Sequence, residues 1–144
     1  MGVKEVRFSG QMTVEFVVAF PAMVAIALIA VNAGLFFSDC ASFDRLFRSS
    51  VCTYAASPAY EQGLEQSCSL VEGAIGDAMG RENLQFTVDS SGSGEGTVTF
   101  TGVMRFQPTL FGKGNLSGAF GVSFPALSHE EKISVCVYKP GLVV

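Results

Sequence analysis

A 23-residue run without a charge constrains this chain more than any other feature. The run extends from Phe16 to Ser38, and 19 of its residues are apolar. As an α-helix at ~1.5 Å per residue it is about 34 Å long, enough to cross the roughly 30 Å hydrocarbon core of a bilayer. A core helix of a soluble domain would show a polar face, and this run has none. The sequence therefore predicts a membrane-spanning helix.

The flanks of the run predict its orientation and its retention. Lys4 and Arg7 precede it and Asp39 follows it, so the positive-inside tendency places the N-terminus in the cytoplasm and the rest of the chain outside. The run is longer than the about 7–15 apolar residues of a secretory signal. Asp39 also stands directly before Cys40, where a lipoprotein site needs a small residue. We expect a single-pass anchor with an extracytoplasmic C-terminal domain.

The composition of the chain argues against a nucleic-acid partner and against disorder of the whole chain. Its 144 residues include 13 acidic and 9 basic side chains, giving a net charge of −4. The basic surface of a nucleic-acid-binding protein is therefore missing, and we expect no nucleic-acid partner. A hydrophobic fraction of 49% with 15% charged residues also excludes disorder of the whole chain.

Four cysteines follow the run, on the expected outer side, where disulfides persist. They are Cys40, Cys52, Cys68 and Cys136. Four cysteines allow three pairings, and sequence alone does not choose between them. The pairing that we consider first joins Cys52 to Cys68 across a helical turn and Cys40 to Cys136. The spacings contain no close pair of the kind that zinc sites favour, so we expect no metal and no cofactor.

The apolar pattern beyond the run predicts a helical hairpin. The first helix continues to about residue 56, Ser57 and Pro58 suit a stop and a restart, and a second amphipathic helix covers 59–79 and ends at Gly80. The apolar residues of these two segments are Phe43, Leu46, Phe47, Val51, Tyr54, Leu64, Cys68, Val71, Ile75 and Met79.

After Gly80 the apolar period changes to two, which predicts strands. We expect a turn at Ser90–Gly96, a loop at Gly112–Gly121, and a glycine, Gly102, that interrupts the apolar face of the second strand. The apolar residues of the strands are Leu84, Phe86, Val88, Val98, Phe100, Met104, Phe106, Phe120, Val122, Phe124, Ile133, Val135 and Val137. The fold class is therefore α+β: a long N-terminal transmembrane and stalk helix, a second amphipathic helix and a small antiparallel sheet.

A search for catalytic residues leaves only His129. It lies in Ser128-His129-Glu130-Glu131, and no nucleophile and orienting group are recognisable around it. We interpret this stretch as a solvated loop before the last strand. No glycine-rich phosphate loop precedes a helix. The sequence therefore predicts no enzymatic activity and no small-molecule substrate.

Glu15 adjoins the apolar run at its cytoplasmic end. A carboxylate at the start of a membrane helix is costly and usually has a partner. Alternatively, the positive end of the helix dipole favours an acidic side chain at this place. The residue alone leaves both interpretations open.

The residues around Glu15 resemble the processing site of type IV prepilins. A basic leader, residues 1–10, ends in Gly10, four residues separate Gly10 from Glu15, and the apolar helix follows at once. In that family a membrane-embedded prepilin peptidase cuts after the glycine, so Gln11 would become the N-terminus. The resemblance implies that Glu15 neutralises the new amine of a neighbouring subunit.

Within the pilin-like proteins, residues 10–40 are most similar to the TadE-like subunits of the tight-adherence (Flp, type IVc) system. The matching residues are Gly10, Gln11, Val14, Glu15, Phe16 and Pro21. The resemblance implies a structural minor pilin that assembles or primes a pilus for adhesion or secretion. Its partners would be a prepilin peptidase, the lipid bilayer and other pilin subunits, which Glu15, Phe16 and Pro21 would contact.

The expected organisation is a leader over 1–10, a transmembrane and stalk helix over 11–56, and an extracytoplasmic α+β domain over 57–144. The alternative function is an uncleaved, signal-anchored extracytoplasmic binding or sensor module.

Overall fold

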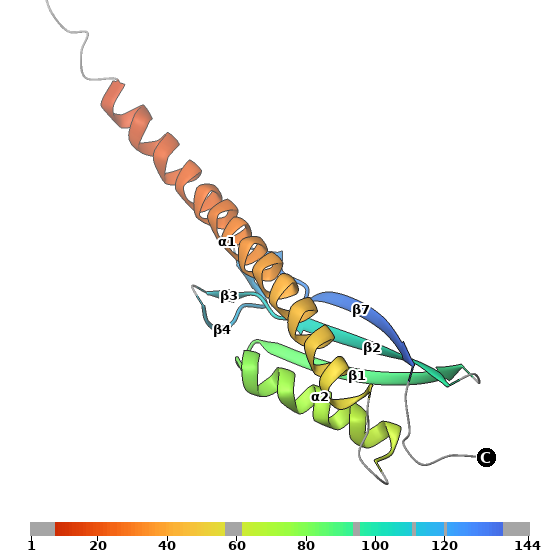
Figure 1. The fold of residues 1–144 in the computed structure, drawn as a ribbon. Coiled ribbons are helices and arrows are strands. Elements are labelled where there is room, and N and C mark those ends of the chain that lie inside the picture. The colour runs from red at the N-terminus through yellow and green to blue at the C-terminus, as the bar shows by residue number, and fades with distance from the viewer. Residues whose placement is uncertain (1–7, 57–61, 94–95, 111, 120, 137–144) are drawn as a thin grey trace, which may run out of the picture.

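One long helix organises the whole molecule. The computed structural model describes residues 8–56, 62–93, 96–110, 112–119 and 121–136. Helix α1 (Phe8–Tyr54) has 47 residues, and the rest of the described chain packs against its C-terminal half (Figure 1). We call this packed part the head domain. The N-terminal half of α1 projects away from it as a rod, which confirms the predicted α+β layout with a long N-terminal helix.

Helix α2 (Leu64–Met79) forms the second arm of the predicted hairpin, but it starts later than expected. Gln62 bridges the two helices instead of joining α2, because its Nε2 donates to the Tyr54 carbonyl at 3.0 Å and to the Ser67 hydroxyl at 2.8 Å. The expected break at Ser57 and Pro58 lies outside the described residues. The end at Gly80 is confirmed, since a Cβ there would lie 2.6 Å from the backbone oxygen of Gly76.

Three antiparallel strands form the main sheet in the order β1-β2-β7. They are β1 (Leu84–Ser93), β2 (Thr97–Phe106) and β7 (Leu127–Cys136). The expected turn at Ser90–Gly96 is wrong in extent, because β1 pairs with β2 as far as Ser93 opposite Thr97. Polar residues remain compatible with a strand here, since the β-ladder bonds the backbone whatever the side chains are.

Between β2 and β7 the chain forms two small hairpins beside α1. They are β3 (Thr109–Leu110) with β4 (Lys113–Asn115), and β5 (Gly118–Ala119) with β6 (Val122–Ser123). The expected Gly112–Gly121 loop thus contains short strands. Gly112 and Gly121 have φ of 81° and 82°, which a glycine adopts without strain. We call residues 107–126 the collar, because Figure 1 shows β3 and β4 next to α1 near the start of its projecting half.

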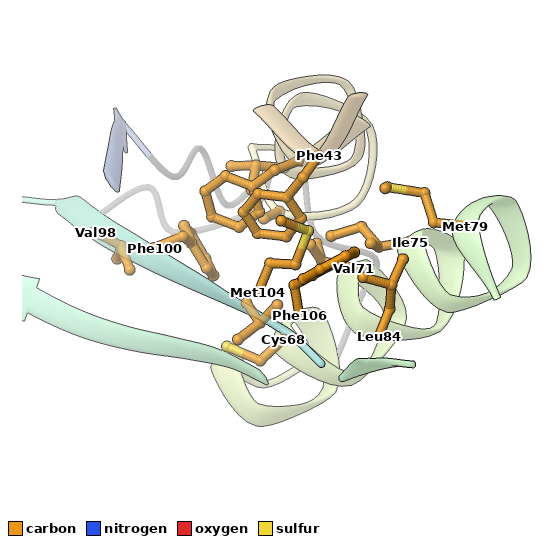
Figure 2. Packing of buried hydrophobic residues seen from close by; sticks show 14 residues of the cluster. Phe43, Cys68, Val71, Ile75, Met79, Leu84, Val98, Phe100, Met104 and Phe106 are labelled. Carbon is orange, nitrogen blue, oxygen red and sulfur yellow. The ribbon is translucent and has the colours of Figure 1, made fainter. Parts of the chain in front are cut away.

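The core of the head domain lies between the two helices and one face of the sheet. Figure 2 shows side chains from α1, α2 and the strands meeting there. The buried apolar residues are Phe43, Phe47, Val51, Ala55, Cys68, Val71, Ile75, Met79, Leu84, Val88, Val98, Phe100, Met104 and Phe106. The rings of Phe43 and Phe47 stack with centroids 5.6 Å apart. They lie over Gly102, which explains why a glycine interrupts the apolar face of β2.

Candidate functional site: the projecting half of helix α1

The projecting half of α1 exposes large apolar side chains along its whole length. They are Met12, Val14, Phe16, Val17, Val18, Phe20, Met23, Ile26, Ile29 and Val31. The helix is long and apolar enough to cross a membrane. An apolar surface of this size is unusual for a part of a protein that faces water. By length and composition it is consistent with a single-pass membrane anchor or a signal sequence.

The processing and contact residues expected from the sequence all lie on this rod. Gly10 and Gln11 lie in the first turns of α1, where backbone N–H groups lack helical partners. Glu15 follows about one turn later and is exposed. It is the only charged residue between positions 11 and 38, and the described residues supply no ion-pair partner for it.

Phe16 and Pro21, the other expected contact residues, also lie on the rod. The ring of Phe16 lies 5.7 Å from that of Phe20, one helical turn away. Pro21 lies inside the helix and has no N–H to donate to the carbonyl of Val17. The projecting half of α1 is thus an apolar rod with one carboxylate near its N-terminal end.

Asn32 joins α1 to the head domain through side-chain hydrogen bonds. Its side chain is 7% exposed, and its Nδ2 donates to the carbonyls of Leu28 at 2.9 Å and Thr109 at 3.0 Å. Its Oδ1 accepts the N–H of Thr109 at 2.8 Å. The amide therefore bonds the backbone of Thr109 as a neighbouring strand would.

Beyond Asn32 the head domain covers part of the uncharged run. Leu35 and Phe36 pack against the core of the head domain, so residues 32–38 are not a free lipid-facing surface. Among the large apolar side chains of this stretch, Phe37 remains exposed. The contact of Asn32 was not predicted from the sequence, although a polar residue inside an apolar run is a signal that could have indicated it.

Three polar contacts join the C-terminal half of α1 to the head domain. The guanidinium of Arg81 pairs with the buried carboxylate of Asp39. His129 Nε2 lies 2.7 Å from Asp44 Oδ1. These two contacts were not predicted from the sequence, because the partners lie 42 and 85 positions apart.

The third contact is between Arg48 and Glu131. Arg48 Nη2 donates to Glu131 Oε1 at 2.7 Å. This hydrogen bond, together with the charge of Glu131, raises the pKa of Arg48. The pair joins β7 to α1 near the C-terminal end of the helix.

The interpretation of His129 and its neighbours as a solvated loop is wrong. They belong to β7, and His129 and Glu131 both face α1 because alternate residues of a strand share one face. The His129 ring also meets Phe43 edge-on, with centroids 6.1 Å apart. These contacts attach the edge strand to the helix.

All four cysteines are free thiols, and the fold does not bring the expected pairs together. Asp44 contacts His129, and Cys40 lies about one helical turn before Asp44, so Cys40 lies near the start of β7. Cys136 lies at the end of β7, roughly 20 Å further along an extended strand. Cys52 lines a surface hollow together with Lys132 of β7. Cys68 lines the groove next to β1, at the other edge of the sheet. The Cys40–Cys136 and Cys52–Cys68 pairings are therefore not supported.

Burial raises the pKa of the Cys40 thiol, and the nearby Asp44 and Asp39 carboxylates raise it further. Within the part of the chain that the structure describes, no three His, Cys, Asp or Glu side chains come together as a metal site.

An open groove of about 770 Å³ runs between α2 and β1 and carries the acidic residues Glu65, Glu72 and Asp89.

Comparison with known proteins adds no relative. No protein-family model, curated protein or solved structure matches this chain. Its function is therefore inferred from its residues and their arrangement.

Proposed function

We propose that this chain is a structural minor pilin of the TadE-like kind, cut after Gly10 and used in assembling or priming a tight-adherence pilus. The observation that carries the proposal is the projecting half of α1: an apolar rod with exposed side chains, one carboxylate near its tip and a folded head at its other end. Such a rod packs equally well into lipid and among identical helices. A subunit of this shape can therefore pass from a bilayer to a filament without exposing the rod to water.

The chemistry of Glu15 supports the same function. After cleavage, the amine of Gln11 would lie four residues from Glu15. In apolar surroundings a carboxylate and an amine that lack partners are both costly, and a charge-assisted contact between neighbouring subunits relieves both costs. Because the two groups would belong to different subunits, the contact would also fix the axial register of adjacent helices.

The head domain supports a minor rather than a repeating role. The buried core residues of α1, the Arg81–Asp39 pair and the Asn32 contact attach it to α1. A head of this size next to the rod limits how closely successive subunits stack along a filament. An initiating or terminal position suits it, and adhesion or secretion would follow from the pilus as a whole.

Cleavage is tested by co-expressing the chain with a prepilin peptidase and measuring its intact mass. We expect loss of residues 1–10 and an N-terminus at Gln11. Gly10→Ile should block the cut, because a β-branched residue at the site hinders the extended backbone that the peptidase must bind. Ser9→Ala is the matched control and should be cut normally. Retention of Met1 in the unmodified chain would contradict the proposal.

The role of Glu15 is tested separately, in cells that assemble the pilus. Glu15→Ala should still be cut but should no longer enter surface filaments, as measured by immunoblotting of sheared pili. Glu65→Ala, which removes an exposed carboxylate from α2, is the control and should assemble. Equal incorporation of the two variants would argue against a subunit contact at Glu15.

The second candidate is an uncleaved, anchored binding or sensor module, and the groove between α2 and β1 favours it. Glu65, Glu72 and Asp89 make this groove acidic, and Glu72 accepts the N–H of Val88 at 3.4 Å. The cleavage measurement separates the two candidates, since this module would keep Met1 and stay in the membrane.

A further inference from the structure

The collar meets α1 where the continuous exposed apolar surface of the helix ends. The last large exposed apolar residue before the collar contact is Val31, and the next residue, Asn32, is bonded to Thr109 on β3. Leu28, one turn earlier, is already buried. Figure 1 shows β3 and β4 beside α1 at this junction. The collar therefore sits at the level at which a bilayer around the rod has to end.

The collar carries no acidic side chain. Residues 107–126 contain no Asp or Glu and a single cation, Lys113, in a chain with 13 acidic residues, and strand β2 before them is also free of acids, with Arg105 as its one charge. Lys113 and Leu110 are both exposed. Acidic side chains are repelled by an anionic membrane surface and lysine is attracted to it. An apolar side chain near a lysine, with no acid close by in sequence, suits the boundary between acyl chains and head groups.

The backbone of the collar limits how deep the helix lies in the bilayer. If residues 16–38 filled the hydrocarbon, the β3–β4 hairpin, which is bonded to Asn32 through Thr109, would lie inside it as well. Strand β4, with Lys113, Gly114 and Asn115 exposed, has polar groups that hydrocarbon cannot satisfy. Residues 12–31 avoid this conflict and span about 30 Å as a helix, which matches the hydrocarbon core.

We propose that the collar docks on the head-group layer of an anionic bilayer, with Leu110 at the acyl boundary and Lys113 against lipid phosphates, while residues 12–31 of α1 cross the hydrocarbon. The collar then sets the depth of the helix and holds the head domain directly on the membrane surface. The proposal rests on α1 crossing a bilayer and does not depend on cleavage after Gly10.

The chain contains no Trp, so single-Trp variants of the full chain report depth directly. They are reconstituted in vesicles of equimolar phosphatidylcholine and phosphatidylglycerol whose acyl chains carry shallow or deep bromine quenchers. Phe20→Trp should be quenched most by deep bromines, and Ile29→Trp and Leu110→Trp most by shallow ones. Leu70→Trp is the matched control, since Leu70 on α2 is 47% exposed and Leu110 is 48% exposed, and it should not be quenched.

Two results would overturn the proposal. An unquenched Leu110→Trp beside a quenched Phe20→Trp would mean that the helix spans but the collar stands off the surface. Deep quenching of Ile29→Trp would move the bilayer centre towards the collar. Neither result bears on cleavage, because no peptidase is present, so failure here is distinguishable from failure of the pilin function.

The anionic preference has its own test. Shallow quenching of Leu110→Trp should be stronger in the mixed vesicles than in phosphatidylcholine alone, and Lys113→Glu should remove most of this difference. Lys132→Glu makes the same charge change on the outer face of β7 and should leave the difference intact. Equal quenching in the two vesicles would overturn the proposed contact with anionic lipid.

Discussion

Gly102 on β2 lies in close contact with two phenyl rings of α1. A Cβ built on Gly102 would lie 2.7 Å and 2.9 Å from Cε2 and Cδ2 of Phe47, and 3.0 Å from Cζ of Phe43. Both rings are fully buried. They also stack on one another, so neither has free space into which it can move. Gly102→Ala should therefore force α1 away from the sheet.

Two opposing contributions set the change in the free energy of unfolding that Gly102→Ala should cause. Overpacking a well-packed core typically costs about 1–3 kcal/mol. Replacing glycine by alanine where the backbone allows it returns about 0.4–1 kcal/mol, because the unfolded chain loses freedom. We expect Gly102→Ala to lower the free energy of unfolding of the head domain by roughly 1–2 kcal/mol.

The assay is urea unfolding of the full chain in a mild detergent, followed by near-ultraviolet circular dichroism of the aromatic core. Gly92→Ala on β1 is the control, since a Cβ there meets nothing within 4 Å, and its stability should stay within about 0.5 kcal/mol of the original. Phe47→Leu combined with Gly102→Ala should recover part of the loss through a favourable coupling of about 1 kcal/mol. Equal stability of the Gly102→Ala and Gly92→Ala chains would refute the close packing of α1 on β2.

Two further predictions concern α1. Asn32→Leu leaves the N–H and carbonyl of Thr109 without their side-chain partner, so we expect a loss of about 2–3 kcal/mol and faster hydrogen exchange of the Thr109 amide, whereas Asn115→Leu, at an exposed position, should change neither. Because the pKa of Cys40 is raised above its ordinary value of 9.0, the folded state favours the neutral thiol. Its contribution to stability is complete below that pH and declines as the pH rises above it. Alkylation of Cys40, which requires the thiolate, should reach its half-maximal rate above pH 9.0; a midpoint below 9.0 in pH-resolved mass spectrometry would contradict the shift.

The helices were the most predictable part of the structure, for a local reason. The stripe of Phe43, Phe47 and Val51 and the stripe of Cys68, Val71 and Ile75 both follow the helical period, and all six residues are buried. A period of this kind needs no knowledge of the partner surface. The start of α2 was less predictable, because it depends on the bonds of Gln62 to Tyr54 and Ser67.

The edge strand β7 shows where local patterns stop being informative. Leu127, His129, Glu131, Ile133 and Val135 share its inner face, but only part of this face is apolar. His129 and Glu131 can occupy it because α1 supplies Asp44 and Arg48 at matching heights. Buried or half-buried polar residues are tolerated when a partner satisfies them, and that partner is distant in the sequence.

The cysteines were misjudged for a related reason. An even number of thiols on the outer side of a membrane segment is compatible with disulfides, but pairing depends on spatial proximity. The order β1-β2-β7 places Cys68 near one edge of the sheet and Cys52 near the other. No spacing along the chain predicts that separation.

By itself, the sequence determined the long apolar helix, the single carboxylate beside it, the hairpin of helices and the change to strand periodicity near residue 84. These features depend on neighbours a few positions apart, so the chain displays them directly. The tertiary structure alone decided how much of the apolar helix stays uncovered. That boundary is set at Asn32 by hydrogen bonds to a residue 77 positions away, and a bond between distant segments forms only once the fold has brought them together.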